Sequence, residues 1–241
     1  MTGTWIIFRR EISQYFRSPI SYIIAGSLLI LTGLYFNGDL AYSLTVKAIN
    51  PSLIPDFMAT AMIFFGPLLT MRMLAEEQRE GTMELLLTAP VNDNAIVIGK
   101  FLSAWLFYTV LLAITFSYQI VVTSISTPDM SHTICAYIGI WLYGGAALAI
   151  GLMFSALTEN QIVAAFLSIA TLTFLYLGDV AGQIVTNLDL ARAIRQLTLA
   201  AHYSGSFAFG IVRAEDIAYF AGIIVIMLFI AVRVVESHRW R

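Results

Sequence analysis

Long apolar runs separated by short polar segments dominate the chain. Phe101 to Pro128 contains no charged residue, and neither does Met130 to Thr158 when His132 is neutral. Each run exceeds the roughly 20 apolar residues that a helix needs to cross about 30 Å of hydrocarbon. The pattern predicts six spanning helices, at Ile20–Phe36, Asp56–Leu74, Ile96–Val122, Thr133–Leu157, Gln161–Leu177 and Asp216–Val235. We therefore expect an all-α integral membrane protein with one transmembrane domain over residues 1–241.

Composition excludes several other classes. The chain is 59% hydrophobic and 12% charged, whereas soluble domains carry roughly 25% charged residues. The net charge of −2 and the lack of a basic stripe give no sign of a nucleic-acid partner. Cys135 is the only cysteine, so an internal disulfide and a cysteine zinc cluster are both excluded. The first apolar run has no small-residue cleavage site, so we interpret it as a retained helix.

The basic residues predict the orientation. Six spans put both termini on one side, and this side holds Arg9, Arg10, Arg17, Arg72, Arg79, Lys100, Arg233, Arg239 and Arg241. The opposite side holds only Lys47, Arg192, Arg195 and Arg213. Because cytoplasmic loops carry the excess of lysine and arginine, we expect both termini to be cytoplasmic.

Residues 2–18 have the pattern of an amphipathic helix. At about 100° per residue, one face collects Trp5, Phe8, Ile12, Tyr15 and Phe16. Arg9, Arg10 and Arg17 fall largely on the opposite face. We expect a helix over the segment 1–19 that lies in the cytoplasmic interface and contacts membrane lipids, with its arginines toward the headgroups. Pro19 ends it before the first span begins.

The loop 75–95 is the longest cytoplasmic connection, and it predicts a separate helix of about two turns. Gly81 permits a break after the second span, Thr82 can cap the new helix, and Pro90 stops it. Met83, Leu86 and Leu87 share one face. Such a helix either rests on the bilayer or docks into another protein. Anionic headgroups would repel the acidic residues beside it, which favours docking. These are Glu76, Glu77, Glu80 and Glu84.

The segment 178–215 lies on the external side in this topology. Apolar residues recur there at helical spacing: Leu188, Ala191, Ile194, Leu197 and Ala201. We expect short external helices before the last span. The fourth predicted span is rich in glycine and alanine, with Gly145/Ala149 and Ala147/Gly151 four residues apart. That spacing favours close helix packing within the subunit.

No chemistry of its own is visible in the chain. Ionisable residues are missing from the middle of the predicted spans, which disfavours an ion-coupled secondary transporter. His202 and Ser204 lack a nucleophile-elbow pattern, and the three histidines are too scattered for a metal site. Gly99-Lys100 is followed by Phe101 instead of the serine or threonine of a phosphate loop. We therefore expect no catalytic residue, no cofactor and no ATP site.

Several segments together resemble the type-2 ABC transporter permeases. Glu76-Glu77, then Arg79 through Pro90, then Ile96 through Phe101 look like the signature after the second span of that family. Arg10-Glu11 through Tyr22 and Ala201-His202-Tyr203 through Phe220 are similar to one branch of it. That branch includes the permeases of the gliding-motility and nitrous-oxide-reductase maturation transporters. The resemblance covers essentially the whole chain.

The resemblance implies an ATP-driven exporter in the inner membrane of a prokaryote. Two ABC ATP-binding subunits would join two permease subunits, identical or different. The helix before Pro19 would be the connecting helix and Gly81–Thr88 the coupling helix. The ATPase interface would comprise Glu76, Glu77, Arg79, Glu80, Gly81, Thr82, Met83, Glu84, Leu86, Leu87 and Pro90. The alternative is a membrane anchor or assembly scaffold, which needs the same spans and no coupling helix.

Overall fold

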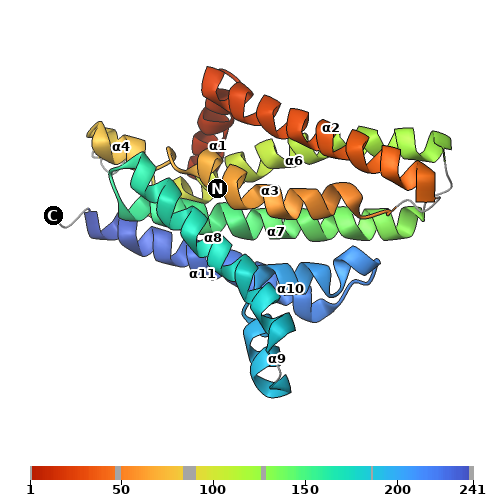
Figure 1. Ribbon diagram of the computed structural model, residues 1–241. Coiled ribbons are helices and arrows are strands. Elements are labelled where there is room, and N and C mark those ends of the chain that lie inside the picture. The colour runs from red at the N-terminus through yellow and green to blue at the C-terminus, as the bar shows by residue number, and fades with distance from the viewer. Residues whose placement is uncertain (1, 47–49, 84–90, 126–128, 186, 239–241) are drawn as a thin grey trace.

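Six long helices lie alongside one another in the computed structural model of the protein (Figure 1). The structure describes residues 2–46, 50–83, 91–125, 129–185 and 187–238. In these ranges, the helices long and apolar enough to cross a membrane are α2 (Pro19–Val46), α3 (Leu53–Thr70), α6 (Asp93–Ile125), α7 (Met130–Leu157), α8 (Gln161–Ile184) and α11 (Ala214–His238). No strand occurs among the same residues. The predicted all-α membrane fold is therefore confirmed.

Shorter helices lie at the two ends of the bundle. They are α1 (Thr2–Tyr15), α4 (Ala75–Arg79), α9 (Leu188–Gln196), α10 (Leu199–Ser204) and the 3-10 turn η1 (Phe207–Phe209). We call the end that carries α4 and the C-terminus the α4 end, and the other the α10 end (Figure 1). Both the beginning of α2 and the end of α11 lie at the α4 end. Helix α9 projects away from the bundle, and helical structure over residues 188–204 matches the expected short helices.

Helix α7 is the centre of the bundle and packs against α3, α6, α8 and α11. Its small residues allow this, as predicted. The Gly144 backbone faces the ring of the fully buried Tyr108, and Gly151 faces the side chain of Thr70. A Cβ atom at either glycine would overlap those neighbours. Tyr108 also donates a hydrogen bond to the Ile140 carbonyl at 3.0 Å, which fixes its ring between α6 and α7.

Two spans end at least seven residues later than predicted. Helix α2 continues through Asn37, Gly38 and Asp39 to Val46, because these residues each disfavour a helix by only about 1 kcal/mol or less. Helix α8 continues past Gly178 to Ile184. There Asp179 accepts a hydrogen bond from Arg195 of α9 at 3.2 Å, so the longer helix is held by contacts distant in sequence.

Candidate functional site

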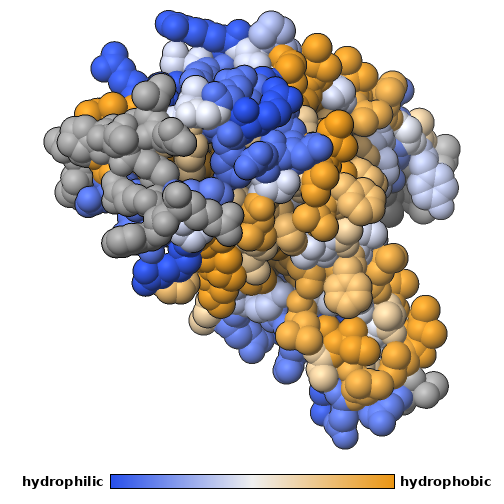
Figure 2. All heavy atoms as spheres, turned by 90° about the vertical axis from the view of Figure 1, so that its left-hand side faces the viewer, coloured by the Kyte–Doolittle hydropathy of each residue, from blue (hydrophilic) through white to orange (hydrophobic). Residues whose placement is uncertain are grey.

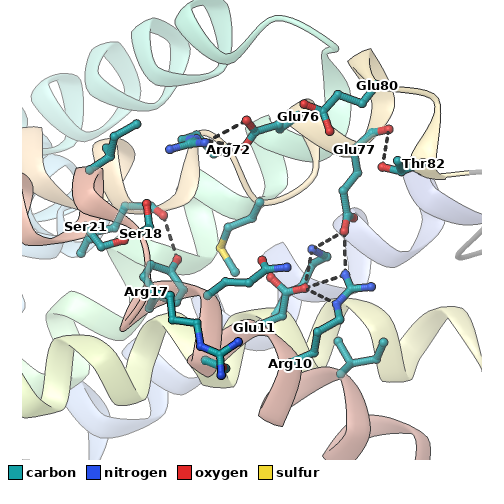
Figure 3. A pocket seen from close by; sticks show the side chains of 18 of the residues that line it. Arg10, Glu11, Arg17, Ser18, Ser21, Arg72, Glu76, Glu77, Glu80 and Thr82 are labelled. Atoms are coloured by element: carbon teal, nitrogen blue, oxygen red, sulfur yellow. Dashed lines mark hydrogen bonds and ion pairs between the residues drawn. The ribbon is translucent and has the colours of Figure 1, made fainter.

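A cleft of about 1090 Å³ opens at the α4 end, between α1, the start of α2 and the segment from the end of α3 to α4 (Figure 3). Its walls are mixed in chemistry. Ile24, Leu68 and Leu69 supply apolar surface, while arginine, glutamate, lysine and serine side chains supply the polar part. Figure 2 views the bundle from this end and shows hydrophilic residues gathered near its centre and top, beside a hydrophobic flank.

Four charged side chains meet at the wall of this cleft, and we call Arg10, Glu11, Glu77 and Lys100 the charge cluster. The Lys100 Nζ lies 3.1 Å from Glu11 Oε1 and 2.9 Å from Glu77 Oε1. Arg10 Nη2 lies 2.7 Å and 2.8 Å from the same two oxygens. Figure 3 shows these contacts converging from α1 and α4. Two cations and two carboxylates thus neutralise one another.

Because it is buried, the charge cluster holds neighbouring helices together. Lys100 is 1% exposed and Glu11 is also buried, and an unpaired buried charge costs several kcal/mol. Burial alone would lower the pKa of Arg10, but hydrogen bonds and charge interactions with Glu11 and Glu77 outweigh it and raise that pKa. Since Arg10 and Glu11 belong to α1, Glu77 to α4 and Lys100 to α6, the charge cluster joins three helices.

Helix α4 is also attached to the end of α7. The Ser155 hydroxyl accepts hydrogen bonds from the backbone N–H groups of Leu74 and Ala75, both at 3.1 Å, and donates to the Met71 carbonyl at 3.0 Å. The Gln78 amide donates to the Ala156 carbonyl at 2.8 Å. These bonds satisfy the backbone where α3 gives way to α4, which fixes the direction of the short helix.

The chain turns sharply after α4 at Gly81, as predicted. Gly81 has φ +69°, a left-handed conformation that glycine adopts without strain. Arg79, Glu80 and Gly81 are exposed at this turn. Glu84, Leu86, Leu87 and Pro90, which the sequence assigned to the same interface, lie outside the described residues.

Three features of this segment bear on the predicted interface. Met83 is 4% exposed and packs in the protein's own core, so it is not a free contact for a partner. Thr82 was expected to cap the helix, but it is itself helical and follows Gly81. Its hydroxyl donates a hydrogen bond to the Glu77 carbonyl at 3.3 Å. Glu76 and Glu77 are engaged inside the chain, because Arg72 lies 2.8 Å from Glu76 and the charge cluster holds Glu77.

Helix α1 exists as predicted, but a different face holds it to the bundle. Ile7 and Glu11 are buried against α6. The close approach depends on Gly99 of α6, where a Cβ atom would lie 2.9 Å from the Ile7 side chain. Arg10 remains exposed on α1, and its guanidinium also pairs with Glu11 and Glu77 of the charge cluster. The helical repeat in the sequence pointed to the aromatic stripe as the buried face, whereas the face that packs against α6 combines the apolar Ile7 with the charged Glu11.

The aromatic stripe of α1 is divided between solvent and protein. Trp5 is 64% exposed, and Phe16 is also exposed. Ile12 and Tyr15 are partly buried and pack against the core. Phe8 stacks on Trp5, with the two ring centroids 5.4 Å apart. The Tyr15 hydroxyl donates to the Leu69 carbonyl at 2.8 Å. Burial and the nearby Glu11 charge raise the pKa of Tyr15 far above its usual range. Arg9 and Arg17 are exposed.

The α10 end carries a second set of polar contacts, which the sequence did not indicate as pairs. Tyr203 donates to Asp56 Oδ1 at 2.9 Å, which ties α10 to α3. His202 Nδ1 lies 2.6 Å from Asp216 Oδ1, and its Nε2 lies 3.1 Å from the Gln196 carbonyl. These contacts hold the short helices against the bundle. Within the described ranges, no group of three His, Cys, Asp or Glu side chains is placed to hold a metal ion.

The chain as a whole matches a known family. The family described as "ABC-2 family transporter protein" matches residues 5–235, a range that begins within α1 and ends within α11. A comparison with curated proteins finds no match.

Proposed function

The chain belongs to the ABC-2 family of transporter proteins, and we propose that its α4 end receives the movement of a separate ATPase and passes it to the membrane-spanning helices. Membership makes the chain a multi-pass permease component of an ABC transporter, which associates with ABC ATP-binding subunits. Beyond this, we propose that the ATPase contacts the permease at the α4 end and that α4 transmits its movement to the spans.

The charge cluster is the observation that carries this proposal. It joins α1, α4 and α6 through four contacts between 2.7 and 3.1 Å. Ser155 and Gln78 join α4 to α7 in addition. A displacement of α4 would therefore move three other helices with it, since packed and hydrogen-bonded elements shift as rigid bodies. A helix that merely rested on the bilayer would have no need of such attachments.

The exposed turn at Arg79–Gly81 marks the contact surface in this proposal. Glu80 forms no ion pair with another residue of the described part of the chain, and its carboxylate is available to a basic group on the ATPase. Leu86 and Leu87, which lie outside the described residues, are the apolar contacts to the ATPase in this proposal. Met83 is buried within the permease.

The assembly in this proposal contains two ATPases and a second permease, as ABC exporters require two ATP sites that close together. The α4 end is cytoplasmic, in agreement with the excess of basic residues on that side. Transport is export across a prokaryotic inner membrane. The similarity of Arg10–Tyr22 and Ala201–Phe220 to the gliding-motility and nitrous-oxide-reductase maturation permeases supports a place in that branch.

Copurification with the ATPase tests the proposal. The tagged chain is extracted in mild detergent with its ATPase, and complex formation and ATP hydrolysis are measured for the wild type, Glu80→Lys and the matched control Asp189→Lys. Asp189 is an exposed carboxylate on α9, at the α10 end. We expect charge reversal at position 80 to weaken the complex about tenfold, with the control unchanged. Equal behaviour of the three proteins contradicts the proposed contact and favours an anchor or scaffold.

A further inference from the structure

The junction between α1 and α2 presents a set of hydrogen-bond donors without acceptors. Helix α1 ends at Tyr15, and α2 begins at Pro19 after a short turn. The Ser18 carbonyl accepts from the Tyr22 N–H at 3.5 Å, so Ser18 is the residue that opens α2. The N–H groups of Ile20 and Ser21 have no acceptor among the described residues. They add to the positive end of a 28-residue helix dipole.

The side chains at this junction are donors as well. Ser21 is 9% exposed, lines the cleft and forms no hydrogen bond through its hydroxyl to a described residue. The Ser21 side chain is thus largely enclosed by protein, and its hydroxyl can still hydrogen-bond to a group inside the cleft. Ser18 and Arg17 line the same part of the cleft, and Figure 3 labels all three. Within one helical turn, the chain thus places two hydroxyls, two free N–H groups and one guanidinium.

Arg17 is the cation of the cleft lining that has no ion pair in the described part of the chain, and the unpaired anion, Glu80, lies on the opposite side of the cleft (Figure 3). Lys100 and Arg10 are neutralised by Glu11 and Glu77, and Arg72 pairs with Glu76 at 2.8 Å. Arg17 is exposed and forms no ion pair with a described residue. Helix N-termini with arginine and hydroxyl groups are a recurrent binding arrangement for phosphate. The junction therefore favours an anion with several acceptor oxygens.

The remainder of the cleft indicates which phosphate compound fits. Ile20, Ile24 and Leu68 extend from the junction along α2 and α3 as an apolar surface. The first candidate span begins at Pro19, so Ser18 and Ser21 lie where the span enters the membrane. Lipid phosphates occupy this depth. A free phosphate would accept hydrogen bonds from the junction but would leave the apolar surface exposed. A phospholipid would bind the junction through its phosphate and cover the apolar surface with an acyl chain.

We propose that this cleft is a phospholipid site. Its phosphate lies against the first turn of α2, within reach of the Arg17 guanidinium and the Ser21 hydroxyl, and an acyl chain follows Ile24 and Leu68. The bound lipid would complete the wall between α1 and α2 beside the charge cluster. This inference concerns the permease alone and stands whether or not α4 contacts an ATPase.

Native mass spectrometry of the delipidated chain in detergent tests the site. The protein is titrated with dioleoyl phosphatidylglycerol, and in a parallel series with dioleoylglycerol, which has the same chains and no phosphate. The variants are Arg17→Gln, Ser21→Ala and the control Arg9→Gln. Arg9 is an exposed arginine of α1 that does not line the cleft. Thermal unfolding of each variant checks that the fold is retained.

For the most tightly bound phosphatidylglycerol molecule, we expect the dissociation constant to rise about tenfold in Arg17→Gln, since a charge-assisted hydrogen bond is lost. Ser21→Ala should weaken it by a smaller factor, and Arg9→Gln should leave it unchanged. Dioleoylglycerol should show no site that depends on Arg17. Equal losses for Arg9→Gln and Arg17→Gln overturn the proposal. The proposal is also overturned if millimolar inorganic phosphate displaces the lipid and binding does not depend on the acyl chains. In that case the hydrogen-bond donors at the start of α2 would bind free phosphate.

Discussion

Lys100 is among the most deeply buried side chains of the protein, and the residues around it are charged as well. Glu11 and Glu77 share its ammonium group, and Arg10 contacts the same two carboxylate oxygens. An arrangement of this kind stabilises only while it is complete, because removing one partner leaves a buried charge of the other sign. At the scale of single residues, the charge cluster is therefore the most sensitive part of the α4 end.

Replacement of Lys100 by methionine tests that sensitivity. Methionine has a similar length but no charge, so Glu11 and Glu77 would share only Arg10. We expect Lys100→Met to lower the free energy of unfolding by about 3 kcal/mol, measured by thermal or denaturant unfolding in detergent. The double variant Lys100→Met, Glu77→Gln should recover part of the loss, since it removes one of the unpaired carboxylates. A single variant as stable as the wild type would show that the charge cluster does not hold α1 to α4.

Residue chemistry was only partly predictable from the sequence. Gly81 was recognised correctly, because a left-handed turn is a local property of glycine. Met83 was assigned to a partner, although its side chain packs in the protein's own core. Arg10 was assigned to the lipid-facing side, and its contact with Glu77 was not anticipated. The Arg10–Glu77 contact joins residues 67 positions apart in the sequence, and periodicity along one segment carries no information about it.

Helices were more accessible to prediction than contacts. The six spans follow from runs of apolar residues, and their starts follow from local polar groups. Asp129 accepts hydrogen bonds from the first turn of α7, and Asn160 does the same for α8. The end of α8 was placed seven residues early, at Leu177. Its last turns are held by α9 and α10: Arg195 contacts Asp179, and a Cβ atom at Gly178 would meet Thr198.

Close packing of α7 gives a prediction at the scale of elements. Gly144→Ala would place a methyl group within the buried ring of Tyr108, and overpacking of this kind destabilises by about 1–3 kcal/mol. Gly222→Ala in α11 is the matched control, because nothing lies within 4 Å of its added methyl group. Alanine there should be neutral or stabilise by up to about 1 kcal/mol. Thermal unfolding in detergent should separate the two variants in sign, and equal shifts would contradict the tight contact between α6 and α7.

At the scale of the whole molecule, the two ends are held together by different sets of contacts. At the α10 end, Tyr203 and His202 tie the short helices to α3 and α11 through Asp56 and Asp216. At the α4 end, charged and hydrogen-bonded contacts join α1, α6 and α7 to one short helix. The sequence predicted the number of spans and the family resemblance, since both rest on local patterns. It did not predict how firmly the segment after the second span is bound to its own bundle, because that depends on which helices become neighbours.

Photo-crosslinking from the exposed turn tests the central claim most directly. Cys135 is replaced by serine, a single cysteine is introduced as Glu80→Cys or as Asp189→Cys, and each is labelled with benzophenone maleimide in the complex with the ATPase. We expect a permease–ATPase adduct from position 80 that changes in yield when ATP is bound, and none from position 189. An adduct from position 189 alone, or equal adducts from both positions, would contradict the claim that the α4 end receives the ATPase.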